Sequence, residues 1–363
     1  MRYLLVTAEY PPFRGGVAHY YGNLVKAWPE GDSIVVLDNS QAKLIAPTGR
    51  WPWLRSFVNV WRIVKQSRAD FLLIGQILPL GTVAWLLSYF TKPYAVFIHG
   101  MDWTMALGSP RKAWLTKRII NRAKTVIAAN SYVAELIVKT CPQAKDKIVV
   151  INPGLASVQK PEVPEALTKE LVEKYQLDGK TIILTVGRLV ERKGVDKTIE
   201  ALVQILPQNP EVHYVVVGDG PYLAACQELV QSLQLEQQVV FIPDADDKER
   251  AAWYQLADIF IMPSRQIGND FEGFGIVYLE AGQAGKPVIA GRSGGVADAV
   301  ADNLNGLMVN PESVTEIALA LKRLIAEPKL RTELGQNGQA RLVNFLWPEQ
   351  ARRLVQFINN LLK

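Results

Sequence analysis

The chain has 363 residues, more than a single hydrophobic core ordinarily holds, so its length predicts two domains. Its composition, 49% hydrophobic and 21% charged, excludes a disordered or fibrous protein. Residues 1–157 carry 19 Lys and Arg against 8 Asp and Glu (net +11), whereas residues 158–363 carry 21 against 27 (net −6). The basic first part predicts an anionic surface or substrate, and the widely spaced Cys141 and Cys226 argue against a disulfide framework.

The first apolar run, residues 3–8, is too short and too close to a charge to be a signal peptide, and it predicts a buried strand. Residues 71–91 contain no charge and are long enough to span a bilayer. Gly75, Pro79 and Gly81 interrupt this stretch. We therefore predict a strand, a turn and a helix there instead of a membrane span.

Apolar runs alternate with helical patterns along both halves of the chain, which predicts an α/β protein with parallel sheets covered on both faces. Predicted strands in the first half are 3–8, 33–37, 71–75, 94–99, 125–129 and 148–151, and predicted helices are 17–27, 55–67, 81–90, 111–122 and 131–139. Predicted strands in the second half are 181–186, 213–217, 239–242, 259–262, 287–290 and 307–309.

A polar, proline-bearing segment, residues 156–165, is typical of an interdomain linker. It predicts an N-terminal domain of residues 1–157 and a C-terminal domain of residues 166–346. Parallel sheets bind ligands at the carboxyl ends of their strands, so we expect functional residues in the loops that follow the strands.

The motif Glu272-Gly-Phe-Gly-Ile-Val-Tyr-Leu-Glu280 is the most informative of these loops. Gly273 and Gly275 permit close backbone approach, and the helix start that follows favours anions through its unpaired N–H groups and its dipole. A phosphate-binding turn with a carboxylate on either side suits a sugar nucleotide, whose diphosphate meets amides and whose hydroxyls meet carboxylates.

Two further loops offer groups for a phosphate. Arg188 and Lys193 lie five residues apart after a predicted strand, so they can converge on one anion, although two solvated loop cations are the alternative. The loop between the first strand and the first helix contains Gly15 and Gly16, whose amides can meet a phosphate, or which simply form an ordinary turn.

His99 ends a predicted strand, where a parallel sheet meets its ligand, so we expect it to be functional; a histidine at the edge of the core is the alternative. Asp244 and Asp246 have a spacing that could hold Mg²⁺ or Mn²⁺. They lie in an acidic stretch that also reads as a solvated loop before a helix. We expect no metal site, because Arg188 and Lys193 can neutralise a diphosphate.

Taken in order, these motifs resemble the retaining glycosyltransferases of family 4, and the resemblance covers nearly the whole chain. It rests on Gly15-Gly16, His99, Asn152-Pro-Gly154, Gly187-Arg188, Lys193-Gly194, Gly218-Asp-Gly220, Glu272 to Glu280 and Gly294-Gly295. Within the family, Glu272 to Glu280 and Gly291-Arg-Ser-Gly-Gly295 are most similar to mannosyltransferases that act on phosphatidylinositol mannosides.

The resemblance implies the GT-B fold, with two Rossmann-like domains facing a cleft and a C-terminal helix, about 347–363, that returns to the first domain. It implies a hexosyltransferase that uses a nucleotide sugar, with GDP-mannose favoured over a UDP-sugar, no obligatory metal, and a lipid-linked or glycan acceptor. A sugar-nucleotide epimerase and a binding protein without turnover are the alternatives; nucleic-acid binding is not expected.

The resemblance also assigns roles to single residues. Arg188 and Lys193 would hold the donor diphosphate, Glu280 the ribose hydroxyls, and Glu272 the transferred sugar. The amides of Phe274, Gly275 and Ile276 would lie near that sugar, and His99 would face it at the reacting centre. Gly16 would contact the distal phosphate, and Gly15 beside it is also assigned to cofactor binding.

Two basic, tryptophan-bearing segments, residues 48–62 and 111–122, predict contact with an anionic membrane. The first contains Trp51, Trp53, Phe57 and Trp61 with Arg50, Arg55 and Arg62. Tryptophans in the core and cations on an ordinary solvated face are the alternative. We expect a cytoplasmic protein that attaches peripherally to the inner face of the membrane.

Overall fold

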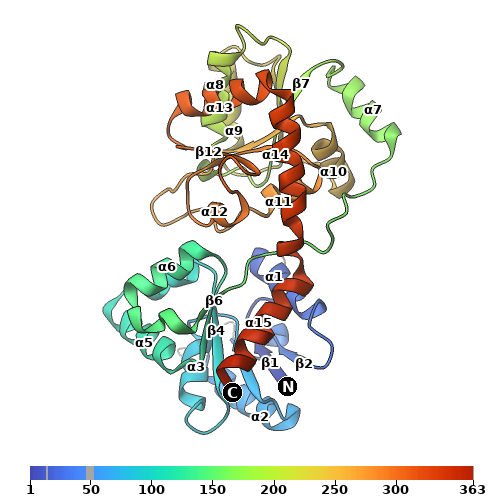
Figure 1. The fold of residues 1–363 in the computed structure, drawn as a ribbon. Coiled ribbons are helices and arrows are strands. Elements are labelled where there is room, and N and C mark those ends of the chain that lie inside the picture. The colour runs from blue at the N-terminus through green and yellow to red at the C-terminus, as the bar shows by residue number, and fades with distance from the viewer. Residues whose placement is uncertain (14, 46–52, 363) are drawn as a thin grey trace. The chain divides into compact units, whose positions relative to one another are not determined.

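The computed structural model describes residues 1–13, 15–45 and 53–362, and the chain divides into two compact units (Figure 1). The first unit contains Met1–Ala156 and Asn344–Lys363, and the second contains Ser157–Val343. Each unit is built on its own six-stranded sheet, in which every neighbouring pair of strands is parallel.

The first sheet has the strand order β2-β1-β3-β4-β5-β6. Its two central strands, β3 and β4, contain no charged residue and are buried, as expected for a parallel sheet covered by helices on both faces. Its strands are β1 (Arg2–Val6), β2 (Ser33–Leu37), β3 (Phe71–Ile74), β4 (Tyr94–Ile98), β5 (Thr125–Ala128) and β6 (Ile148–Val150). The helices are α1 (Gly16–Lys26), α2 (Leu54–Ser67), α3 (Leu80–Leu87), α4 (Met101–Ala106), α5 (Pro110–Arg122) and α6 (Ser131–Thr140).

The last helix, α15 (Trp347–Leu362), packs into the core of the first unit, beside α1 (Figure 1). Trp347 and Ile358 are buried there, and the Tyr3 hydroxyl donates to Asn359 Oδ1 at 3.2 Å. The segment that follows β6 is hydrogen-bonded to the same helix, because the backbone N–H of Asn152 donates to Gln350 Oε1 at 3.0 Å. This helix therefore completes the hydrophobic core that the first strands begin.

The second sheet has the order β12-β11-β10-β7-β8-β9. Its strands are β7 (Thr181–Val186), β8 (Val212–Val217), β9 (Val239–Ile242), β10 (Ile259–Met262), β11 (Val288–Gly291) and β12 (Gly306–Val309). The helices of this unit are α7 (Glu165–Lys174), α8 (Val195–Ile205), α9 (Leu223–Ser232), α10 (Asp247–Leu256), α11 (Ile276–Gln283), α12 (Val296–Ala299), α13 (Val314–Ala326) and α14 (Pro328–Arg341).

The predicted α/β class and the two parallel sheets are confirmed, with strand ends that differ by one or two residues. Residues 71–91 form β3, a turn and α3, and no helix in the described ranges is long and apolar enough to cross a membrane. Strand β4 ends at Ile98 because His99 donates its backbone N–H to Asp102 Oδ1 at 2.9 Å. The His99 side chain therefore stands in the loop that follows the strand.

Candidate functional site

A buried carboxylate between two cations forms the centre of the candidate site in the second unit. The Glu272 side chain accepts hydrogen bonds from Lys193 Nζ and from Arg192 Nη1, both at 2.6 Å. Arg192 also pairs with Asp270 at 3.1 Å. Burial alone would raise the pKa of Glu272, but Lys193 and Arg192 outweigh it and hold that pKa below its ordinary value. Glu272 is therefore an anion at neutral pH.

The turn that carries Lys193 follows the carboxyl end of β7. Residues Glu191–Lys193 form a single 3₁₀ turn, which ends at Gly194 with φ +74°. A Cβ on Gly194 would lie 2.3 Å from the carbonyl oxygen of Pro263, so only glycine allows this turn to pack against the loop after β10. In this compact turn the neighbouring side chains of Arg192 and Lys193 both reach Glu272.

Helix α11 begins directly after this carboxylate. Gly275 is its N-cap with φ +77°, and the Phe274 side chain before it is buried. Ile276, the first helical residue, is half-buried. The first N–H groups of a helix have no partner one turn earlier in that helix. In α11 the N–H of Tyr278 donates to the Gly275 carbonyl at 3.0 Å, so the candidate donors at this helix start are the N–H groups before Tyr278.

Glu280 lies one turn further along α11 and is held by a neighbouring helix. The Tyr254 hydroxyl of α10 donates to Glu280 Oε2 at 2.7 Å. Burial, and after it the charge of Glu280, raises the pKa of Tyr254 well above its ordinary value, so this hydroxyl keeps its proton. The hydrogen bond fixes the orientation of the Glu280 carboxylate.

Arg188 differs from Lys193 because it is exposed and has no hydrogen bond or ion pair to any other residue in the described part of the chain. Lys193 Nζ lies close to Gly187, the residue before Arg188, since a Cβ added to Gly187 would be 4.0 Å from that nitrogen. The structure thus brings Lys193, Glu272 and the start of α11 together and leaves Arg188 beside them. Sequence reasoning missed Arg192, although the run Glu191–Lys193 contains two adjacent cations.

In the first unit, His99 is held by a buried tyrosine of α1. His99 Nε2 lies 2.7 Å from the Tyr21 hydroxyl, which donates its single proton to the Gly75 carbonyl at 2.6 Å. His99 must therefore carry its own proton on Nε2, which leaves Nδ1 as an acceptor. Burial lowers the pKa of His99 to about 4, so the ring is neutral at pH 7.

Asp102 supports the same loop. Its Oδ1 accepts the backbone N–H groups of His99 and Gly100 at 2.9 and 2.8 Å. Burial raises the pKa of Asp102 to about 6, and these backbone hydrogen bonds oppose the rise. Neither Tyr21 nor Asp102 was predicted, because a tyrosine of an apolar helix and a lone aspartate carry no distinguishing pattern.

Gly15 caps the N-terminus of α1, and Gly16 is its exposed first residue. Arg14 lies outside the described residues. A Cβ on Gly15 would lie 3.8 Å from Glu9 Oε2, and burial, followed by the charge of Asp102, raises the pKa of Glu9. A phosphate that approached this helix start would meet a carboxyl group as well as amides.

One of the two possible metal ligands has a structural role as a helix cap. Asp246 caps α10, and its Oδ1 accepts the backbone N–H groups of Lys248 and Glu249, both at 2.8 Å. Asp244 is exposed in the preceding turn. Within residues 1–13, 15–45 and 53–362 there is no cluster of three or more His, Cys, Asp or Glu side chains that could hold a metal ion.

Comparison with known proteins places this geometry in a family. Residues 14–156 match the family model described as Glycosyltransferase Family 4, and residues 168–341 match Glycosyl transferases group 1. A GDP-mannose-dependent α-(1-6)-phosphatidylinositol monomannoside mannosyltransferase of Mycolicibacterium smegmatis is 29% identical over 98% of both chains. A GDP-mannose-dependent mannosyltransferase of Corynebacterium glutamicum, which acts on monoacylated phosphatidylinositol monomannoside, is 27% identical over 98% of this chain and 97% of its own.

Among solved structures, Anabaena HepE in complex with UDP has the same architecture, with a TM-score of 0.78 and 19% identity over 99% of this chain and 100% of its own. The family models and the full-length relatives agree with the two parallel sheets and with the ordered motifs. The chain therefore belongs to the glycosyltransferases of family 4 and has the GT-B fold.

Proposed function

We propose that this glycosyltransferase retains anomeric configuration and moves a hexose, with mannose favoured, from a nucleotide diphosphate sugar to a lipid-linked or glycan acceptor. The observation that carries the proposal is Glu272, held as an anion between Lys193 and Arg192 at the start of α11. The GDP-mannose dependence of the mycobacterial and corynebacterial relatives supports GDP-mannose. The UDP bound to HepE keeps a UDP-sugar as the second candidate.

In this proposal Arg188 and Lys193 bind the donor diphosphate, Glu280 binds the ribose hydroxyls and Glu272 binds the transferred sugar. The backbone amides of Phe274, Gly275 and Ile276 contact the donor, and Gly15 and Gly16 lie at its distal phosphate. His99 contacts the sugar. The Tyr21 hydrogen bond supports the last role, because it leaves His99 Nδ1 able to accept a hydrogen bond from a sugar hydroxyl.

The reaction forms a bond between the acceptor oxygen and the anomeric carbon of the donor, and breaks the bond from that carbon to the diphosphate. The acceptor attacks from the face that the diphosphate leaves, and its proton passes to a donor phosphate oxygen. Arg188, Lys193 and the start of α11 stabilise the negative charge that develops on the diphosphate. No side chain is required as a base.

A donor screen tests the proposal. Thermal shift with GDP-mannose, UDP-glucose, GDP and UDP should identify one nucleotide whose binding raises Tm. At a hundredfold excess over Kd, binding should add about 2.7 kcal/mol to the free energy of unfolding. Mass spectrometry should then show a hexose added to an acceptor only with that donor. Conversion of the donor sugar in the absence of any acceptor would indicate an epimerase and contradict transfer.

We expect the activity to survive EDTA. Two cations and a helix start supply positive charge to the diphosphate, and Asp246 is occupied in capping α10. Initial rates measured with and without a millimolar excess of chelator should agree. Complete loss of activity that Mn²⁺ restores would show that a metal site has been overlooked.

We also propose that the first unit attaches to an anionic membrane. Trp61 of α2 is exposed, and Trp114 of α5 is 55% exposed. Arg111 and Arg118 are exposed three residues before and four residues after Trp114, so the three side chains share one face of α5. Trp53 and Phe57 are half-buried, which fits packing as much as lipid contact. Arg50 and Trp51 lie outside the described residues.

Cosedimentation with anionic vesicles at low and physiological salt measures this attachment. The double variant Arg111→Gln with Arg118→Gln should bind roughly 30-fold more weakly at low salt, because each cation near such a surface contributes about 1 kcal/mol. Leu319→Ser, which changes an exposed leucine of α13 in the second unit, is the control and should bind like the native protein. Absence of binding at either salt, with free sugars accepted efficiently, would contradict the attachment.

A further inference from the structure

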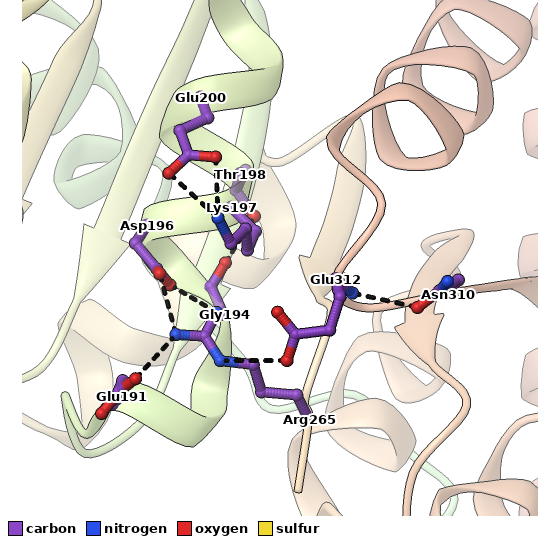
Figure 2. Close-up of polar contacts among 9 residues, drawn as sticks. All are labelled: Glu191, Gly194, Asp196, Lys197, Thr198, Glu200, Arg265, Asn310 and Glu312. Atoms are coloured by element: carbon purple, nitrogen blue, oxygen red, sulfur yellow. Dashed lines mark hydrogen bonds and ion pairs between the residues drawn. The ribbon is translucent and has the colours of Figure 1, made fainter. Parts of the chain in front are cut away.

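A buried arginine lies beneath the turn that carries Lys193. Arg265 follows β10 and is only 4% exposed. Its Nη1 and Nη2 donate to the two carboxylate oxygens of Asp196 at 2.9 and 2.8 Å, a bidentate pair (Figure 2). Nη2 also lies 3.3 Å from Glu191 Oε1, and Nε lies 3.7 Å from Glu312 Oε1. One guanidinium thus holds three carboxylates.

These contacts fall on both ends of the segment that contains Lys193. Glu191 begins the 3₁₀ turn, and Asp196 lies in the first turn of α8. The backbone N–H of Arg265 donates to the carbonyl of Arg192 at 2.8 Å, so the same residue also holds the middle of the turn. Side chain and main chain of Arg265 therefore fix the turn at three points.

The energetics favour a geometric role over a stabilising one. Removing an arginine and an aspartate from water costs about as much as their attraction returns, so a buried pair contributes little net stability. Burial alone would lower the pKa of Arg265, but its hydrogen bonds to Asp196 and the nearby carboxylates raise it, and the side chain stays charged. The planar guanidinium fixes direction as well as distance, which a lysine ammonium does not.

We propose that Arg265 is a positioning residue for donor binding: it holds the Glu191–Lys193 turn so that Lys193 and Arg192 stand at Glu272, without itself touching the donor. The inference rests on the proposed role of Lys193 at the donor diphosphate. Tyr278 contributes to the same loop, since its hydroxyl donates to the Met262 carbonyl at 2.7 Å just before Arg265.

Calorimetric titration with GDP and UDP, together with donor kinetics, tests the inference on the full chain. Arg265→Lys keeps the charge but loses the fork, and it should weaken binding of the preferred nucleotide about tenfold or more, as expected when a charge-assisted contact is misaligned. The acidic limb of its pH profile should move upward, because a displaced turn no longer holds the pKa of Glu272 down. Glu312→Gln changes a partner that is 58% exposed in its side chain, and it should leave affinity within twofold.

A purely structural role would lower Tm while affinity and the pH profile of the folded protein stayed native, and that result would overturn the inference. If Arg265→Lys does not fold, Asp196→Asn decides by the same measurements, since it keeps the shape of the bidentate partner and removes its charge. Failure of the native protein to bind either nucleotide would instead overturn the proposed function, and the inference with it.

Discussion

Lys193→Ala and Arg188→Ala should each lower kcat/KM for the nucleotide sugar by about 10- to 100-fold, because each removes charge-assisted hydrogen bonds worth roughly 1.5–3 kcal/mol. The two variants should differ in stability. Lys193 is buried on Glu272, so its removal leaves that carboxylate with Arg192 as its remaining ion-pair partner and should also lower Tm. Arg188 has no such partner within the described residues, so its variant should melt like the native protein.

Donor kinetics and thermal denaturation measure both effects. Lys197→Ala is the matched control, because Lys197 lies only four residues after Lys193 and forms a partly exposed ion pair with Glu200 at 2.9 Å within α8. A pair within one helix contributes about 0–1 kcal/mol, and Lys197 has no proposed contact with the donor, so the control should change kcat/KM little. Near-native kcat/KM in both Arg188→Ala and Lys193→Ala would refute the assignment of the diphosphate site.

Gly275→Ala should have the second large effect, on stability and on donor binding together. Its φ of +77° is strained for any residue with a Cβ, and that Cβ would lie 2.4 Å from the Tyr278 ring. The ring cannot swing away freely, because Tyr278 is buried and hydrogen-bonded to Met262. Strain and overpacking together should cost about 2–5 kcal/mol, and the start of α11 should move away from Glu272.

Gly285→Ala separates these two causes. Gly285 lies just beyond the other end of α11 with φ +71°, but a Cβ there would meet no atom within 4 Å. This control should show the backbone strain, about 1–2 kcal/mol, with native nucleotide affinity. Chemical denaturation gives the stability and calorimetry gives the affinity. Equal losses of affinity in the two variants would mean that the start of α11 does not bind the donor.

The fold was predictable because the apolar runs and the glycines that end them are local signals. Strands such as β7 and β10 agree to the residue, and the uncharged stretch from 71 to 91 was correctly divided at its glycines and proline. The strand ends at His99 and Gly291 were less predictable. At His99 the backbone N–H donates to the Asp102 side chain, a contact that no local pattern of apolar residues indicates.

Residues of the candidate site could be predicted only where they lie close together in the sequence. Glu272, Gly275 and Glu280 lie on one continuous motif, so the order of residue types was enough to predict that they gather around one helix start. Arg192 was missed because sequence spacing gives no sign that two adjacent side chains of a 3₁₀ turn reach one carboxylate. Tyr21 and Arg265 act through tertiary contacts with residues 78 and 69 positions away, which no local pattern contains.

The place of α15 in the first core has a consequence for how the protein is made. A ribosome completes the sheet of the first unit at β6, but the helix that covers Tyr3 and Tyr20 emerges only after the whole second unit has been translated. At about 5–20 residues per second, the apolar surface awaiting that helix stays uncovered for on the order of 10 to 40 seconds. We therefore expect the N-terminal part of the nascent chain to bind chaperones during synthesis of the second unit, and to complete its native core only after α15 has emerged.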